Sequence, residues 1–156
     1  MKISYIVIDM KNIEEFMANA RIPARLACIN RDNWPVVLSL WYIKENGKIY
    51  FATQETAKVV EYLKNNSKCS VEIATEQPPY KGVRIQGNAR IDKEKGEEIL
   101  KKLFERYNVK TDSKLYEYLM RNIEKEVAIE LTIEKTFTWD FTERMEEAIN
   151  TQRSEC

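Results

Sequence analysis

The order of apolar and polar residues along the chain predicts antiparallel strands with helices at their edges. Short apolar runs, or runs that alternate apolar with polar residues, predict strands at 25–30, 36–43, 48–53, 69–74, 83–91 and 127–140. Helical spacing predicts helices at 12–20, 54–65 and 94–107, and a further helix after Asp112. No internal repeat, low-complexity segment or linker separates these elements. We therefore expect one α+β domain over residues 1–156, with its strands wrapped into a barrel.

Two of these strands form the most strongly predicted pair. Residues 36–43 are the most apolar stretch of the chain and are rich in strand-forming residues, which predicts a strand covered on both faces. The dipeptide Asn46-Gly47 follows, and both residues tolerate the positive φ angles of a type I′ turn. Residues 48–53 then form the return strand of a hairpin.

Polar residues stand where the helices are expected to begin. Asn12 precedes the first helix, Thr53 the second, and Asp112 or Ser113 the last. Their side-chain oxygens can accept hydrogen bonds from the free N–H groups of a first helical turn. Within the alternating segment 83–91, Gly87 interrupts the apolar face, which indicates a bend in that strand.

The balance of charge limits the classes of partner that we expect. The chain carries 25 Lys and Arg against 25 Asp and Glu, so it has no basic field to hold nucleic acid. Apolar residues make up 44%, which excludes intrinsic disorder. No run approaches the roughly 18 to 20 apolar residues of a membrane span, and residues 1–9 are charged too early for a signal peptide. We expect a soluble, cytoplasmic protein without nucleic-acid or membrane partners.

The residue types that are missing exclude several chemistries. The chain has no histidine, which removes Ser-His-Asp and Cys-His catalysis and His-ligated zinc or haem. Its three cysteines, Cys28, Cys69 and Cys156, form no Cys-x-x-Cys pair, and no metal site is expected. No G-x-G-x-x-G motif is present. Any reactivity must therefore come from carboxylates, Lys, Tyr or a bound cofactor, and a cofactor is the simplest source.

One junction between a strand and a helix has the chemistry of a phosphate site. A helix that begins directly after Thr53 offers free N–H groups, the positive end of its dipole, a hydroxyl and the ammonium of Lys58. An ordinary capped helix with one exposed lysine fits the same spacing, and spacing alone does not distinguish the two.

Several short segments, in their order and spacing, carry a resemblance to a known family. They are 25–29, 34–37, 41–42, 46–53 with Lys58, 79–87 and 139–140. Together they resemble the FMN-binding split-barrel family related to pyridoxamine 5′-phosphate oxidase, over about residues 12–141, which leaves a polar tail at 142–156. The resemblance implies a six-stranded antiparallel Greek-key split β-barrel with peripheral helices. It also implies a homodimer in which both protomers line each of two flavin sites.

The resemblance also implies which residues contact FMN. Those matched to the strand along the isoalloxazine ring are Leu38, Ser39, Leu40 and Trp41, and those beside the ribityl chain are Phe51, Ala52 and Thr53. Lys58 matches a phosphate-binding lysine. Gly82 stands at a cofactor-contacting position that is Gln in the oxidases, and Trp139 resembles a C-terminal residue that approaches the neighbouring protomer's cofactor.

Three departures from the family pattern limit the expected activity. Ala57 stands where many relatives carry a phosphate-binding Arg, and Val36 replaces a flavin-contacting Arg of the oxidases. The oxidases also use a His near the C-terminus, which this chain lacks. These departures argue against oxidation of pyridoxamine phosphate itself.

The resulting hypothesis is an FMN-dependent oxidoreductase that transfers hydride between the flavin and a small-molecule substrate. A flavin-binding protein without catalysis, a reductase with a deazaflavin coenzyme in the same cleft, and an empty barrel that binds a protein partner remain alternatives. No side chain stands out as a general acid or base, so the catalytic residues are left unassigned.

Overall fold

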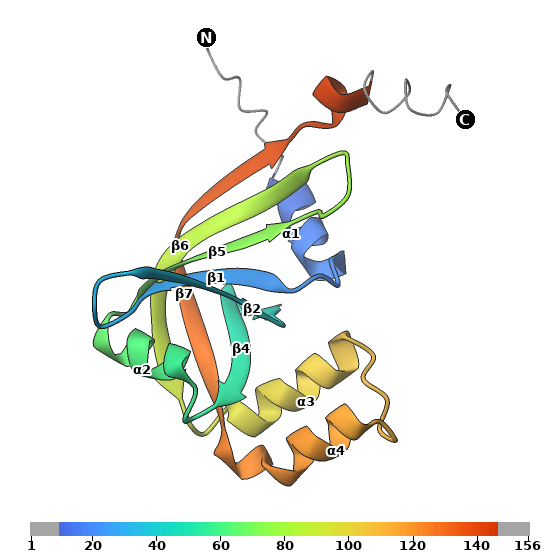
Figure 1. The fold of residues 1–156 in the computed structure, drawn as a ribbon. Coiled ribbons are helices and arrows are strands. Elements are labelled where there is room, and N and C mark those ends of the chain that lie inside the picture. The colour runs from blue at the N-terminus through green and yellow to red at the C-terminus, as the bar shows by residue number, and fades with distance from the viewer. Residues whose placement is uncertain (1–9, 147–156) are drawn as a thin grey trace.

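The computed structural model describes residues 10–146, and Figure 1 shows a curled antiparallel sheet with helices around it. The elements in chain order are α1 (Met10–Asn19), β1 (Ala24–Ile29), β2 (Pro35–Leu40), β3 (Ile43–Glu45), β4 (Lys48–Gln54), α2 (Lys58–Asn65), β5 (Lys68–Ala74), β6 (Lys81–Asp92), α3 (Gly96–Arg106), α4 (Lys114–Arg121), the 3-10 turn η1 (Ile123–Lys125) and β7 (Glu126–Asp140). Within the described residues, none of the helices has the length and apolar character needed to cross a bilayer.

The sheet has seven strands in the order β2-β1-β5-β6-β7-β4-β3, and each neighbouring pair is antiparallel. The predicted α+β class is confirmed, with seven strands in place of six. The extra strand arises because the apolar run 36–43 breaks at Trp41 and Tyr42 into β2 and β3. These two strands form the opposite edges of the sheet. Since only two residues link them, the sheet must curl until its edges approach, which makes a split barrel.

Side chains of alternating strand positions fill the barrel. Phe51, Ile85 and Ile129, from three different strands, have no exposed surface. The alternation predicted for 83–91 is confirmed, and the pairing of β6 with β7 shifts register between Gln86 and Gly87. The indicated bend at Gly87 therefore lies opposite a β-bulge in β7, in which Glu134 is the extra residue. Cys28 and Cys69 are buried in the same core as small apolar residues.

The prediction that the apolar run is covered on both faces is wrong for β2. Its inward residues, Val36, Leu38 and Leu40, pack against the core. On the other face, the side chain of Val37 is 65% exposed, and Trp34 in the preceding turn is 70% exposed. The apolar pattern did not reveal that β2 is an edge strand whose outer face has no covering element within the described chain.

Two of the three predicted helix starts differ from the structure. Helix α2 begins at Lys58, and Thr53 lies within β4 opposite Val127, so Thr53 caps no helix. Asn12 lies inside the first turn of α1, which already begins at Met10. The predicted cap at Ser113 is confirmed, because its hydroxyl accepts a hydrogen bond from the Tyr116 N–H at 3.2 Å.

Of the predicted polar tail, residues 142–146 are helical. Residues 147–156, with Cys156, lie outside the described residues, as do residues 1–9.

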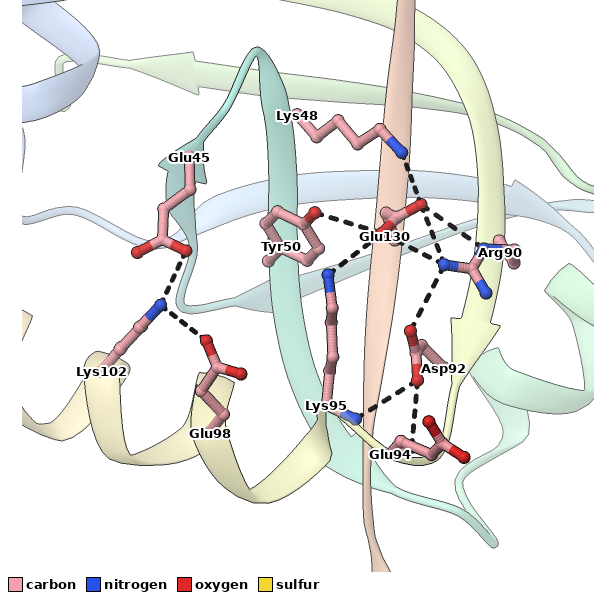
Figure 2. Close-up of polar contacts among 10 residues, drawn as sticks. All are labelled: Glu45, Lys48, Tyr50, Arg90, Asp92, Glu94, Lys95, Glu98, Lys102 and Glu130. Carbon is pink, nitrogen blue, oxygen red and sulfur yellow. Dashed lines mark hydrogen bonds and ion pairs between the residues drawn. The ribbon is translucent and has the colours of Figure 1, made fainter.

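An ionic network on the outer face of the barrel surrounds the buried carboxylate of Glu130 of β7 (Figure 2). The carboxylate accepts hydrogen bonds from Lys48 Nζ at 2.8 Å, from the Tyr50 hydroxyl at 3.1 Å and from Arg90 Nη2 at 3.2 Å. Lys95 Nζ lies 3.9 Å from its second oxygen. These donors, Lys48 foremost, outweigh the effect of burial and hold the pKa of Glu130 at about 2.

We expect Glu130→Gln to lower the free energy of unfolding by about 2 kcal/mol at neutral pH and by almost nothing in strong acid. The pKa of Glu130 is lower in the folded than in the unfolded chain. Its stabilisation is therefore complete above the ordinary carboxyl pKa and is lost as the pH falls toward about 2. Urea unfolding of both proteins at about pH 7, 5 and 3 measures this difference. Glu94→Gln, an exposed carboxylate of the same region, is the matched control. An equal difference at all three pH values would contradict the assignment.

Candidate functional site

A pocket of about 290 Å³ lies between the β2–β3 link, the outer face of β4 and the helices α3 and α4, and we call it the pocket beneath α3. Leu100 and Leu103 of α3 and Leu119 of α4 supply apolar walls. Its volume is at the lower end of the roughly 300–1,000 Å³ that small-molecule sites span. The full set of lining residues is Pro23, Ser39, Leu40, Trp41, Ala52, Thr53, Gln54, Leu100, Leu103, Leu119 and Glu126.

Five of the ten residues predicted to contact FMN line this one pocket. They are Ser39, Leu40, Trp41, Ala52 and Thr53. Two of the other predicted residues, Leu38 and Phe51, direct their side chains into the barrel instead. The side chain of Phe51 is fully buried in the barrel, and that of Leu38 packs against the core.

The indole of Trp41 forms a flat, supported wall of the pocket. It stacks on Tyr107 with ring centroids 4.8 Å apart and an angle of 11° between the planes. The Tyr107 hydroxyl donates a hydrogen bond to the Ile22 carbonyl at 3.1 Å and accepts one from the Tyr42 N–H at 3.3 Å. These bonds fix Tyr107, and through it the plane of Trp41. A rigid aromatic surface of this kind suits a planar ring system.

Glu126, at the start of β7, is the one ionisable side chain among the described residues that line the pocket, and the sequence pattern did not single it out. The residue is 4% exposed, and Gln54 Nε2 donates a hydrogen bond to its Oε1. Burial raises the pKa of this carboxyl, and the bond from Gln54 offsets the rise in part. Its position at the head of an apolar run, on the face away from the barrel interior, was the available signal. That signal becomes useful only once α3 is known to cover this face.

Lys58, the predicted phosphate ligand, does not line the pocket. It is the first residue of α2, and its side chain is 77% exposed with Nζ 3.3 Å from Glu61 Oε2. Arg31 Nε lies 2.7 Å from the other oxygen of Glu61. Ala57 occupies the N-cap position without a side-chain cap, so no side chain of the described residues satisfies the N–H groups of this first turn.

Gly82 and Trp139 lie together near one end of the long β6–β7 ribbon (Figure 1). They are paired across the two strands, and the Trp139 ring fills the space in front of Gly82. A Cβ at Gly82 would approach both this ring and the Ile73 carbonyl to 2.7 Å. Gly82 borders a second cavity, of about 890 Å³, between α1 and the β5–β6 loop. This cavity shares no lining residue with the pocket beneath α3.

Comparison with known proteins identifies one family and several solved structures with the same fold. A model of the family described as "Pyridoxamine 5'-phosphate oxidase" matches residues 10–140. No curated protein matches the chain. A conserved hypothetical protein from Mycobacterium tuberculosis, Rv2991, has a similar structure, with a TM-score of 0.75 and 21% identity over 90% of this chain and 89% of its own.

Other solved structures with this fold carry descriptions that name F420, FAD or heme. One described as an F420 reductase has a TM-score of 0.66 and 16% identity over 79% of this chain and 94% of its own. An FAD-binding protein from Mesorhizobium loti has a TM-score of 0.61 and 18% identity, covering 83% and 92% of the two chains. A protein from Vibrio cholerae described as a heme storage protein has a TM-score of 0.65 and 15% identity, covering 85% and 95%. At these identities the structures show a shared fold.

Proposed function

This chain belongs to the pyridoxamine 5′-phosphate oxidase family, and from that membership we propose that it binds a flavin-type cofactor, FMN or a deazaflavin, and transfers hydride between it and a small molecule. The observation that carries the proposal is the pocket beneath α3, which gathers Trp41, Ala52 and Thr53 from separate strands and loops into one apolar cavity. The F420 reductase and the FAD-binding protein of the same fold support this class of cofactor.

The residues of the pocket suit the parts of such a cofactor. Trp41, held flat by Tyr107, offers a planar surface for a ring, and the leucines of α3 and α4 offer apolar contacts to it. Thr53 and Gln54 offer polar groups for a hydroxylated chain. A bound flavin supplies the hydride chemistry, which none of the lining side chains supplies by itself. The chain's own contribution is to bind, orient and shield the group.

We propose that the working unit is a homodimer. Val37 on β2 and Trp34 beside it are exposed apolar side chains, as are Tyr80 and Phe137 near the end of the β6–β7 ribbon. Exposed apolar side chains of this size favour a surface that a second chain covers. Trp139, which the family resemblance places near a neighbouring protomer's cofactor, lies outside the pocket beneath α3 of its own chain, and this supports a second copy as the partner. Light scattering is expected to give twice the chain mass of 18.4 kDa.

Two other cofactor-related activities receive less support from the chain. Oxidation of pyridoxamine phosphate is not proposed, because Val36 replaces an arginine of the oxidases and the chain has no histidine. The missing histidine also argues against a His-ligated haem, although one protein of this fold is described as a heme storage protein.

An absorbance spectrum of the purified protein, before and after soaking with FMN and desalting, tests the proposal. Bands at roughly 375 and 450 nm that stay with the protein support FMN, and a band at about 420 nm supports a deazaflavin. Reduction of the bound group by NADH or NADPH, with turnover on an acceptor, separates an oxidoreductase from a carrier. A spectrum that stays flat after soaking with either cofactor sinks the proposal.

Lys58→Ala is expected to weaken FMN binding about tenfold and to leave riboflavin binding unchanged. The expectation follows from the ammonium at the uncapped start of α2, since FMN differs from riboflavin only by its phosphate. Fluorescence quenching of both ligands measures the two affinities. Lys64→Ala, at the other end of the same helix, is the matched control and should change neither. Equal losses for FMN and riboflavin would show that Lys58 does not hold the phosphate.

A further inference from the structure

The pocket beneath α3 contains a carboxyl group that neither the sequence nor the family assignment explains. We propose that the Glu126 carboxyl, oriented by Gln54, donates a hydrogen bond to a neutral acceptor atom, a carbonyl oxygen or ring nitrogen, of the cofactor or substrate that occupies this pocket. The inference rests on the proposed function and deepens it, because it names the residue that determines which atom of the cofactor or substrate lies against this side of the pocket.

The first support is the geometry of the pair. Gln54 and Glu126 stand opposite each other at the paired ends of β4 and β7. Gln54 Nε2 donates to Glu126 Oε1, which holds the carboxyl in one orientation. In the described part of the chain, the second oxygen of Glu126 has no hydrogen-bond partner, although the residue is 4% exposed and lines the cavity. This oxygen is therefore free to bond a ligand.

The second support is the apolar setting. Leu100, Leu103 and Leu119 line the same pocket as the carboxyl, and burial raises the pKa of Glu126. Gly96 lets the start of α3 approach the Glu126 backbone closely. A protonated carboxyl is a hydrogen-bond donor, whereas an ionised one only accepts. Burial thus favours the form that can donate.

Among residues 10–146, no cation compensates an ionised Glu126. Glu55, beside Gln54, pairs with Lys93 at 3.6 Å, and Lys95, just before α3, lies 3.9 Å from Glu130. The charged residues of the helix and turn that precede β7 are all exposed, and they are Lys114, Glu117, Arg121, Glu124 and Lys125. None of these groups lines the pocket.

The contrast with Glu130, on the same strand, shows how strongly the surroundings determine the pKa of a carboxyl. Glu130 is equally buried, but Lys48, Tyr50 and Arg90 hold its pKa down at about 2. Glu126 has only the amide of Gln54 as a partner in the described chain, and its pKa is raised. Environments that separate the pKa values of two carboxyls commonly assign them different roles. Glu130 stabilises the fold, and Glu126 contacts the ligand.

The consequence is that ligand binding depends on pH. Below the pKa of Glu126, the neutral carboxyl donates to the ligand. Above it, the donor is lost and an uncompensated negative charge faces the ligand, so affinity falls. The same charge disfavours a phosphate or carboxylate at this wall, which places the ring or ribityl chain there and the phosphate elsewhere.

Riboflavin and FMN titrations of wild type, Glu126→Gln and Glu124→Gln from about pH 5 to about pH 9 test the inference. Riboflavin removes the titration of the phosphate itself from the comparison. Wild type should lose about tenfold in affinity across this range. Glu126→Gln, which keeps a neutral donor, should stay near the low-pH affinity throughout, and Glu124→Gln should follow wild type.

Unfolding of the same proteins without ligand gives a second readout. The pKa of Glu126 is higher in the folded than in the unfolded chain, so its burial destabilises the fold increasingly as the pH rises above the ordinary carboxyl value. Glu126→Gln should therefore match wild type near pH 4 and exceed it in stability near pH 8. Parallel pH profiles for wild type and Glu126→Gln, with flavin bound by both, overturn the inference and leave the proposed function standing. If no variant binds flavin at any pH, both fall.

Discussion

Replacing Gly96 with alanine is expected to lower the free energy of unfolding by at least about 3 kcal/mol. Helix propensity alone predicts the opposite sign, since alanine is better than glycine by up to about 1 kcal/mol inside a helix. Close contact between Gly96 and β7 reverses this sign. A Cβ at position 96 would lie 2.0 Å from the Glu126 carbonyl oxygen, 2.3 Å from its carbon and 2.7 Å from the Val127 nitrogen. All three are backbone atoms, which no side-chain rotation can move away.

Relief of this clash requires α3 to move away from the strand beneath it. Leu100 and Leu103 of α3 are walls of the pocket, so the same substitution is expected to weaken flavin binding. Urea unfolding and fluorescence quenching measure the two effects. Gly47→Ala is the matched control, because its Cβ would meet nothing within 4 Å. There only the positive φ of +74° opposes alanine, at a cost of about 1 kcal/mol. A Gly96→Ala protein as stable as Gly47→Ala would show that α3 does not depend on this close approach.

Local chemistry decided the elements that the sequence predicted well. The turn at Asn46-Gly47 has both residues at positive φ, as a type I′ turn requires, and it joins β3 to β4. The predicted partner strand 36–43 is wrong for its larger part, because β2 pairs with β1 and only residues 43–45 pair with β4. Ser113 caps α4 through its own hydroxyl. In each case, residues close in sequence fix the outcome.

Tertiary placement decided the features that the sequence did not reveal. Whether an apolar strand is central or at an edge depends on its neighbours in space, and β2 is an edge strand. Thr53 has the chemistry of a cap, but its backbone pairs with β7 instead. Glu126 became a candidate only after α3 and α4 were seen to cover its face of the sheet.

The predicted site is partly gathered by a single chain. The segment 39–41 and the segment 52–53 meet at one pocket because β2, its link and β4 surround it. Lys58 at the start of α2 and the Gly82–Trp139 pair lie outside that pocket. Lys58 was predicted from the chemistry of the junction between a strand and a helix as well as from the family resemblance, whereas Gly82 and Trp139 were predicted from the resemblance alone. The resemblance implies sites that combine two protomers, and the pattern of a single chain contains no signal for such an arrangement.

Arg106→Ala is expected to lower the free energy of unfolding by about 3 kcal/mol, because this side chain connects α3 to the end of α1. Its Nη2 donates hydrogen bonds to the carbonyls of Met17 at 2.8 Å and Ala20 at 2.7 Å, and its Nη1 donates to Ala18 at 3.0 Å. These carbonyls belong to the end of α1 and the residue after it, where a helix has no internal donors left and where its dipole favours a cation. The guanidinium also lies 4.7 Å from the centre of the Tyr42 ring.

Arg106→Lys separates the charge from the shape of this contact. An ammonium keeps the charge near the end of α1 but cannot reach three carbonyls with a planar fork or stack on Tyr42 in the same way, so we expect a loss of about 2 kcal/mol. Arg121→Ala, at the exposed end of α4, should change stability by less than about 0.5 kcal/mol. Because Tyr107 follows Arg106 and supports Trp41, the alanine variant should also bind flavin more weakly. If alanine and lysine at position 106 prove equally harmless, water can replace the guanidinium at these carbonyls, and other contacts must position α1.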